Sequence, residues 1–403
     1  CHSHAFQRVM AGLAETRGSG RDDFWSWREL MYRLSAQLTP DHVSAIAAQL
    51  YVEMMKGGYT AVGEFHYLHH APGGVAYSNP AQMSHSVIEA AADAGIHLTL
   101  LPVLYSYSGF GEQPAEPHQA RFTHDVESFG TLLEALAAAY GNRPGVCLGL
   151  AFHSLRAVAA DQLANAWLLG NLLGADAPMH IHIAEQKKEV EACLRDRGCR
   201  PVEWLLDHVD VNHRWCLVHA THLSDTECDN LARSGAVVGL CPTTEANLGD
   251  GIFPAVRYHG LGGACAIGSD SHVCVDPVHE LRLLEYSQRL AFERRVLLTD
   301  DENPSNGASL LRRVWRGGSS ALGIAAGAIA PGSRADLLVL DTSDPVLYGK
   351  CADGLLDTWI FAAQGRVVKD VMVGGEWRIL DGCHAREEAI KRRFLAVIDE
   401  LAL

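Results

Sequence analysis

Seven short apolar runs, each followed by a segment of helical character, recur between residues 59 and 270 of the chain. They are 59–65 (YTAVGEF), 96–105 (IHLTLLPVLY), 146–153 (VCLGLAFH), 179–184 (MHIHIA), 215–221 (WCLVHAT), 236–242 (AVVGLCP) and 264–270 (ACAIGSD). Their apolar residues are nearly continuous rather than alternating, which is typical of parallel strands buried on both faces. A regular alternation of such strands with helices restricts the chain to an α/β fold with a parallel sheet.

The segments between the runs carry helix start and stop signals. Thr39 can cap a helix, Pro40 suits its first turn, and Gly57-Gly58 ends it. We expect further helices over 80–94, 124–140, 157–170, 186–197, 224–234 and 277–295.

These seven strand–helix units are one short of the eight that close a (β/α)₈ TIM barrel. A strand that ends at His2 supplies the eighth, so we expect the first strand to be truncated in this chain. A barrel open along two edges predicts an insoluble or inactive chain, and an active full-length gene product. The alternative is an open doubly wound sheet, but the glycine-rich phosphate loop that it would carry after an early strand is not found.

The texture of the sequence changes after residue 323, where short runs and Gly-Gly or Asp-Gly turns indicate β-strands. We divide the chain into a barrel, residues 1–322, and a C-terminal part, residues 323–403. The second part is expected to be a small β-sandwich-like domain that lacks its N-terminal strands, followed by a terminal helix over about 385–401.

The composition of the chain argues against some classes of binding partner. A formal charge of −15 argues against nucleic acid and anionic membranes, because their phosphates would repel the chain. No apolar run approaches the roughly 20 residues that span a bilayer. The 11 cysteines are scattered without a CxxC pair, which favours free thiols in a reducing cytoplasm.

Polar residues that can bind metals stand where the predicted strands end, and the active site of a TIM barrel lies at this end. They are His2, His4, Glu64, His66, His153, His182, His219 and Asp270. His2 and His4 stand two residues apart, so they project to one side of a strand and can reach one ion. A third histidine and a carboxylate would complete a set suited to Zn²⁺ or another divalent transition metal.

The motifs HSH (2–4), HIHIAE (180–185), VHATH (218–222) and GSDSH (268–272) together resemble the amidohydrolase superfamily. The resemblance is to its mononuclear deaminase branch, because the fourth strand ends in FHSLR rather than in the lysine of dinuclear members. It implies one divalent metal ion, Zn²⁺ in the first place and Fe²⁺ as the alternative, held by His2, His4, His182 and Asp270. His182 is the ligand rather than His180, since only His182 has Glu185 three residues on.

The same resemblance implies a catalytic set. Asp270 takes a proton from the hydrolytic water while it ligates the metal, and Glu185 carries protons to the departing nitrogen. His219 polarises the electrophilic group or stabilises the tetrahedral intermediate.

Longer stretches narrow the resemblance to the formimidoylglutamate deiminase family, among them HSHAFQR, DFWSWRELMYR, GYTAVGEFHYLHH, FHSLRAV and TEANLGDGIFPA. This implies hydrolysis of N-formimidoyl-L-glutamate to N-formyl-L-glutamate and ammonia in histidine degradation, by a cytoplasmic homodimer. The substrate contacts implied are Gln7, Tyr67, His153 and Arg156. Arg28 is a second carboxylate anchor, in its own or a neighbouring subunit's site. Glu245 and Asn247 are expected to line the pocket.

Two alternative functions make different predictions. A nucleobase deaminase acting on guanine, cytosine or adenosine uses the same metal chemistry, but predicts no turnover of a dicarboxylate and little effect of Arg156→Ala. A non-catalytic scaffold is rejected, because such a protein should have lost metal ligands, and all four ligand positions, Glu185 and His219 are present.

Overall fold

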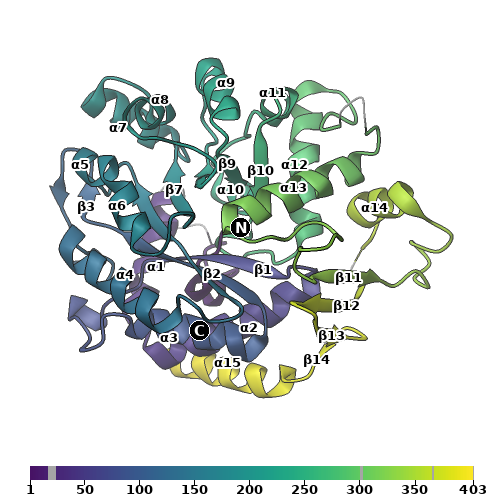
Figure 1. The fold of residues 1–403 in the computed structure, drawn as a ribbon, viewed down its shortest axis with the longest axis horizontal. Helices are drawn as coiled ribbons and strands as arrows, with labels where there is room; N and C mark the ends of the chain where they lie inside the picture. The colour runs from purple at the N-terminus through teal and green to yellow at the C-terminus, as the bar shows by residue number, and fades with distance from the viewer. Residues whose placement is uncertain (17–23, 300–302, 365–366, 403) are drawn as a thin grey trace.

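The computed structural model describes residues 1–16, 24–299, 303–364 and 367–402 of the chain. Parallel strands form a curled sheet at the centre, and helices surround it (Figure 1). The hydrogen-bonded order is β1 (Ala61–His66), β2 (His97–Leu104), β6 (Leu150–Ser154), β7 (Met179–Ile183), β8 (Trp215–His219), β9 (Val237–Leu240) and β10 (Ala264–Ile267). These are the seven predicted strands in chain order, so the TIM-barrel prediction is confirmed.

Residues 2–4 lie between the first and last of these strands. Ser3 forms parallel bridges to both Glu64 and Asp270. Backbone bonds join Phe65 N to Ser3 O at 2.9 Å and His4 N to Asp270 O at 3.1 Å. The expected gap along two edges is therefore spanned at the level of Ser3, and the start of the described chain lies at the centre of the ring (Figure 1).

The helices of the barrel follow the predicted pattern. They are α2 (Pro40–Gly57), α3 (Gln82–Ala94), α4 (Val126–Tyr140), α7 (Lys187–Arg197), α8 (Pro201–His208), α9 (Asp225–Arg233), α10 (Pro242–Leu248), α11 (Ala255–Gly260), α12 (Pro277–Phe292) and α13 (Asn306–Leu322). The Thr39 side chain caps α2 by accepting from His42 N at 3.2 Å. Gly58 ends that helix with φ 114°, a left-handed conformation that favours glycine.

Two predicted elements are interrupted. The fourth strand is split into β5 (Val146–Leu148) and β6 at Gly149, where a side chain would stand 2.5 Å from Pro178 O. The helix expected over 157–170 is two short helices, α5 (Ala160–Ala164) and α6 (Ala166–Asn171). The break falls at Asn165, whose side chain donates to Asp161 O at 2.8 Å and so competes with the helical backbone bonds.

The segment that carries Arg28 lies outside the helices predicted from the sequence. It is a helix, α1 (Phe24–Ser35), which brings Arg28 onto the same face as Met31 and Tyr32. Short elements complete this region: β3 (Tyr107–Gly109), β4 (Gln113–Pro114) and three 3₁₀ helices, Ala5–Met10, Pro72–Gly74 and Pro117–Gln119.

The C-terminal part contains a four-stranded antiparallel sheet: β11 (Leu337–Leu340), β12 (Val368–Val373), β13 (Glu376–Leu380) and β14 (Cys383–His384). The part after residue 323, for which β-strands were expected, also contains a helix, α14 (Ala352–Phe361). The expected terminal helix is α15 (Glu387–Leu401), which runs beside α2 (Figure 1). The division into two domains stays a prediction.

Among the described residues, no helix combines the length and the apolar character needed to cross a bilayer.

Candidate active site

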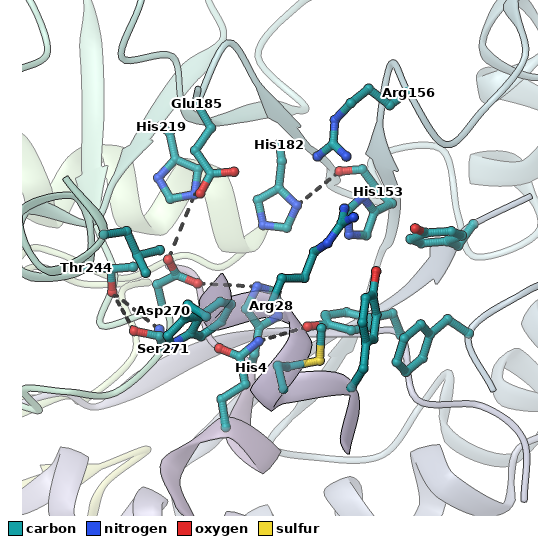
Figure 2. A pocket seen from close by; sticks show the side chains of 18 residues that line it. His4, Arg28, His153, Arg156, His182, Glu185, His219, Thr244, Asp270 and Ser271 are labelled. Atoms are coloured by element: carbon teal, nitrogen blue, oxygen red, sulfur yellow. Dashed lines mark hydrogen bonds and ion pairs between the residues drawn. The ribbon is translucent and has the colours of Figure 1, made fainter. Parts of the chain in front are cut away.

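Three histidine side chains converge where the parallel strands end. The Nε2 atoms of His2 and His4 are 3.2 Å apart, and those of His2 and His182 are 3.0 Å apart. Asp270 Oδ1 lies 3.4 Å from His2 Nε2 and 3.3 Å from His4 Nε2. All four side chains are buried. Figure 2 shows three of them, His4, His182 and Asp270, facing one another.

The spacing of these atoms fits a metal ion. Ligand atoms placed tetrahedrally about 2.0–2.1 Å from one Zn²⁺ are roughly 3.3 Å apart, close to the four separations above. His4 Nδ1 lies 2.9 Å from Phe65 O, and His182 Nδ1 lies 3.0 Å from His153 O. A carbonyl oxygen only accepts, so each Nδ1 carries the proton and each Nε2 presents a lone pair. Lone pairs that face one another at this distance repel, and a cation bound between them removes the repulsion.

Burial favours the neutral imidazoles that such a site needs. It lowers the pKa of His4, and lowers the pKa of both His2 and His182 well below the ordinary value. The neighbouring histidines add to the effect on His2 and His182, because two charged rings would repel each other.

The loop that carries His2 and His4 is held from below by Glu64. Its carboxylate accepts from Ser3 Oγ at 2.5 Å, from Ala5 N at 2.7 Å and from Tyr51 Oη at 3.2 Å. Glu64 thus does not reach the metal cluster itself. His180 also points away, with its Nε2 2.7 Å from Ala321 O.

Beside the cluster stands a group of acid–base residues. His219 Nε2 lies 3.7 Å from Glu185 Oε1 and 3.8 Å from Asp270 Oδ2. Burial opposes a charge on His219, but these carboxylates and Glu245 outweigh it and hold its pKa well above the ordinary value. Burial raises the pKa of Glu185 to about 7, with His219 opposing the rise. Near neutral pH such a carboxyl can both give and accept a proton.

The backbone at these strand ends is strained. Ala184, His219 and Asp270 have φ values of 50°, 68° and 47°, in the left-handed region that non-glycine residues seldom adopt. Such strain clusters at functional sites, where it aims side chains that an ordinary strand would turn elsewhere.

One cavity is lined by most of the residues predicted to bind the metal, to contact the substrate or to act in catalysis. It is lined by ten of the eleven, His4, Gln7, Arg28, Tyr67, His153, Arg156, His182, Glu185, His219 and Asp270, while His2 lies behind it in the metal cluster. Arg28 lines the cavity of its own chain. The side chains of Arg28 and Arg156 approach His153, at the end of the cavity away from Glu185 and His219 (Figure 2).

The expectation for the TEANLGDG segment was wrong in part. Asn247 does not line the cavity but bonds Glu15 on the surface at 2.6 Å, because the segment forms α10 and turns this side chain outward. Glu245 is buried behind His219, and accepts from its Nδ1 at 3.2 Å. From this helix, Thr244 and Leu248 line the cavity instead.

Other cavity residues were missed by the sequence analysis: Trp27, Met31, Tyr32, Tyr105, Phe122 and Ser271. Two signals could have found some of them. Tyr105 is the last residue of the predicted strand 96–105, and other predicted site residues also stand at strand ends. Tyr32 stands four residues after Arg28, which is one helical turn.

A barrel with a histidine–aspartate cluster at its strand ends defines a hydrolase of the amidohydrolase type. The sequence profile of the amidohydrolase family matches residues 1–378, and the chain belongs to this family. It is 53% identical to formimidoylglutamate deiminase of Pseudomonas aeruginosa over 400 residues, 99% of this chain and 87% of that protein. It is 28% identical to 5-methylthioadenosine/S-adenosylhomocysteine deaminase of Natronomonas pharaonis, over 93% of this chain and 78% of that protein.

Solved structures agree. The crystal structure of an amidohydrolase from Brucella melitensis has a TM-score of 0.94 and 47% identity, and the match covers 100% of this chain and 88% of that one. An adenosine deaminase from Xanthomonas campestris with bound zinc has a TM-score of 0.82 at 22% identity, covering 100% and 84% of the two chains, which indicates a shared fold.

Proposed function

We propose that the chain is a deiminase that hydrolyses N-formimidoyl-L-glutamate to N-formyl-L-glutamate and ammonia, as a step of histidine degradation. The observation that carries this is one cavity lined both by the metal cluster and by two guanidinium groups, Arg28 and Arg156. A dicarboxylate that bears an amidine needs both features. The 53% identity to a formimidoylglutamate deiminase supports the same substrate.

The metal would be held by His2, His4, His182 and Asp270, and we propose Zn²⁺, which histidine nitrogen and carboxylate oxygen suit. When bound, it lowers the pKa of water toward neutrality and so supplies a nucleophile at ordinary pH.

The residues of the chain then do the rest. His153, Arg156 and Arg28 orient the substrate, so that its amidine carbon faces the cluster. Gln7 and Tyr67, whose side chains are joined by a hydrogen bond of 2.8 Å, line another wall of the same cavity. Water adds to the C=N carbon, and Asp270 takes up its proton. Glu185 protonates the nitrogen to give a C–NH₂ group. The proton that the added hydroxyl loses then passes through Glu185 to this nitrogen, the C–N bond breaks, and ammonia leaves as the carbonyl of the formyl group forms. The proton held by Asp270 then restores Glu185.

The test is ammonia release by the metal-loaded protein offered N-formimidoyl-L-glutamate beside guanine, cytosine and adenosine. We expect turnover of the formimidoyl compound alone, abolished by a chelator and restored by Zn²⁺. His182→Ala should abolish it with loss of bound metal, and Arg156→Ala should raise KM at least 10-fold. Arg143→Ala is the matched control, because Arg143 pairs with Glu89 on the surface. Turnover of a base, with none of the formimidoyl compound, would refute the proposal.

We propose further that the enzyme is a homodimer in the cytoplasm. Light scattering of the purified protein gives its mass in solution, and cell fractionation gives its compartment.

A further inference from the structure

A buried glutamine stands behind the aromatic wall of the cavity. Gln119, at the end of the 3₁₀ helix Pro117–Gln119, is 1% exposed. Its Oε1 accepts from Glu116 N at 2.8 Å. A backbone N–H can only donate, so this bond decides which end of the amide is oxygen and turns the NH₂ group the other way.

That NH₂ group meets two phenol oxygens. Gln119 Nε2 donates to Tyr105 Oη at 2.9 Å and to Tyr32 Oη at 3.2 Å. An amide has two N–H bonds, so both phenols act as acceptors here and neither gives up its own proton. If one phenol donates its proton to the oxygen of the other, the O–H group of the other phenol is still available as a donor. Both tyrosines are buried and line the cavity, which therefore receives at least one O–H donor from this wall.

Tyr32 and Tyr105 are separated from the proposed metal ligand His182 by the ring of His153. The ring centroid of Tyr105 is 4.5 Å from that of His153, which is 5.3 Å from that of His182. The Arg28 guanidinium lies 5.4 Å from the ring centroid of Tyr32. Of the described residues that line the cavity, the carboxylates are Glu185 and Asp270, and both stand at the metal end.

The electrostatics fit an anion at this place. Burial raises the pKa of Tyr105, while Arg156 and Arg28 both oppose the rise, so both guanidinium groups act on this hydroxyl. The phenol keeps its proton at neutral pH and can donate it. Two cations and neutral O–H donors around one end of a cavity are a set that binds a carboxylate.

We infer that the hydroxyl groups of Tyr32 and Tyr105, held by Gln119, bind the side-chain carboxylate of the substrate. This rests on the proposed deiminase function and deepens it. The α-carboxylate stands next to the amidine nitrogen and so remains near the cluster, whereas the side-chain carboxylate reaches past His153. The tyrosine pair thereby selects a dicarboxylate. Gln119 is a positioning residue that acts through the two phenols.

Two substrates separate this role from a structural one: N-formimidoyl-L-glutamate and N-formimidoyl-L-norvaline, in which a methyl group replaces the side-chain carboxylate. For Tyr32→Phe/Tyr105→Phe we expect kcat/KM to fall about 10- to 100-fold on the glutamate compound, mainly through KM. On the norvaline compound it should change less than threefold. Tyr140→Phe, which removes a hydroxyl bonded to His85 Nδ1 at 2.6 Å outside the cavity, should change neither.

Gln119→Glu tests the donor argument. The new side chain has the same shape, but its carboxylate accepts the phenol protons and withdraws them from the substrate. We expect KM for the glutamate compound to rise as in the double variant, with kcat, bound metal and thermal midpoint unchanged. Equal losses on both substrates, or no loss on either, would overturn the inference.

Direct binding keeps the two proposals distinguishable. N-formyl-L-glutamate and N-formyl-L-norvaline are titrated calorimetrically into the metal-loaded wild type and the double tyrosine variant. Suppose that the wild type lacks deiminase activity, and that the double variant loses affinity for N-formyl-L-glutamate but not for N-formyl-L-norvaline. The proposed function is then refuted and the proposed subsite stands. If the wild type is active and the variant binds both ligands as the wild type does, the subsite fails.

Discussion

Glu245 is a buried carboxylate that touches the proposed reaction centre only through His219. Its Oε1 accepts from Cys241 N at 2.9 Å as well as from His219 Nδ1 at 3.2 Å. The first bond anchors the carboxylate to the backbone, and the second places the ring proton on Nδ1 and aims Nε2 at Glu185 and Asp270.

We therefore expect Glu245→Leu to lower kcat of the proposed deiminase about 10- to 100-fold, the usual effect of losing a group that orients a catalytic side chain. Glu245→Gln should lose less, because an amide oxygen can accept both bonds. Steady-state kinetics measure this. Glu53→Gln, which breaks a pair with Arg8 away from the cavity, is the control. Equal activity of the Leu and Gln variants would contradict the orienting role.

The predicted metal ligands, together with the predicted catalytic His219, differ in a physical way from the residues missed by sequence. His2, His4, His182, His219 and Asp270 stand at the ends of apolar strands, and a barrel brings all strand ends to one face, so local pattern and fold class were enough to gather them. Tyr32 on α1, Tyr105 just after β2 and Gln119 in a 3₁₀ helix meet because these three segments pack together beside the cavity. No spacing in the sequence encodes that packing.

At the scale of elements, the strands of the barrel were predictable because each is a continuous apolar run. The interruptions were not, since Gly149 splits its strand through the approach of Pro178 from elsewhere in the fold. Helix α1 was missed because it lies before the first of the strand–helix units that the apolar runs define, so no neighbouring strand marked it.

Strand β1 has a glycine, Gly63, where residues 1–4 run parallel beside it, and this close approach gives a testable prediction. A side chain at Gly63 would stand 2.3 Å from Cys1 O and 2.7 Å from Leu322 Cδ2. We expect Gly63→Ala to push the HSH segment away, to lower the free energy of unfolding by about 1–3 kcal/mol and to weaken metal binding. Urea unfolding and metal analysis measure the two effects.

Gly130→Ala is the matched control for that substitution. It lies within α4, nothing stands within 4 Å of the added group, and alanine favours a helix, so stability should stay or rise by about 0.5–1 kcal/mol. A Gly63→Ala variant as stable and as rich in metal as Gly130→Ala would show that the close approach does not constrain the barrel.

At the scale of the whole molecule, buried neutral histidines make folding sensitive to acid. His259 is the cleanest example, because it is buried on α11 away from the cavity, and burial lowers its pKa to about 3 from 6.5. Below pH 6.5 the imidazole of His259 is protonated in the unfolded chain but stays neutral in the folded chain. This histidine therefore lowers the free energy of unfolding progressively as the pH falls from 6.5 toward 3.

His259→Gln removes that difference. Relative to the wild type, the variant should gain about 2 kcal/mol of unfolding free energy between pH 7.5 and pH 5, at about 1.4 kcal/mol per pH unit below 6.5. Urea titrations at several pH values measure it. A His259→Gln curve parallel to that of the wild type would refute the assignment.

The ring is joined where residues 2–4 lie between β1 and β10, and the proposed ligands come from both sides of that seam. His2 meets His182 across 180 positions of the chain, and Asp270 lies farther still. During synthesis on a ribosome, a nascent chain that does not yet include Asp270 can hold no complete set of ligands. Binding of the ion would thus show that every barrel strand has been made and placed, and its binding energy would offset the entropy lost in closing the long loop from His2 to Asp270.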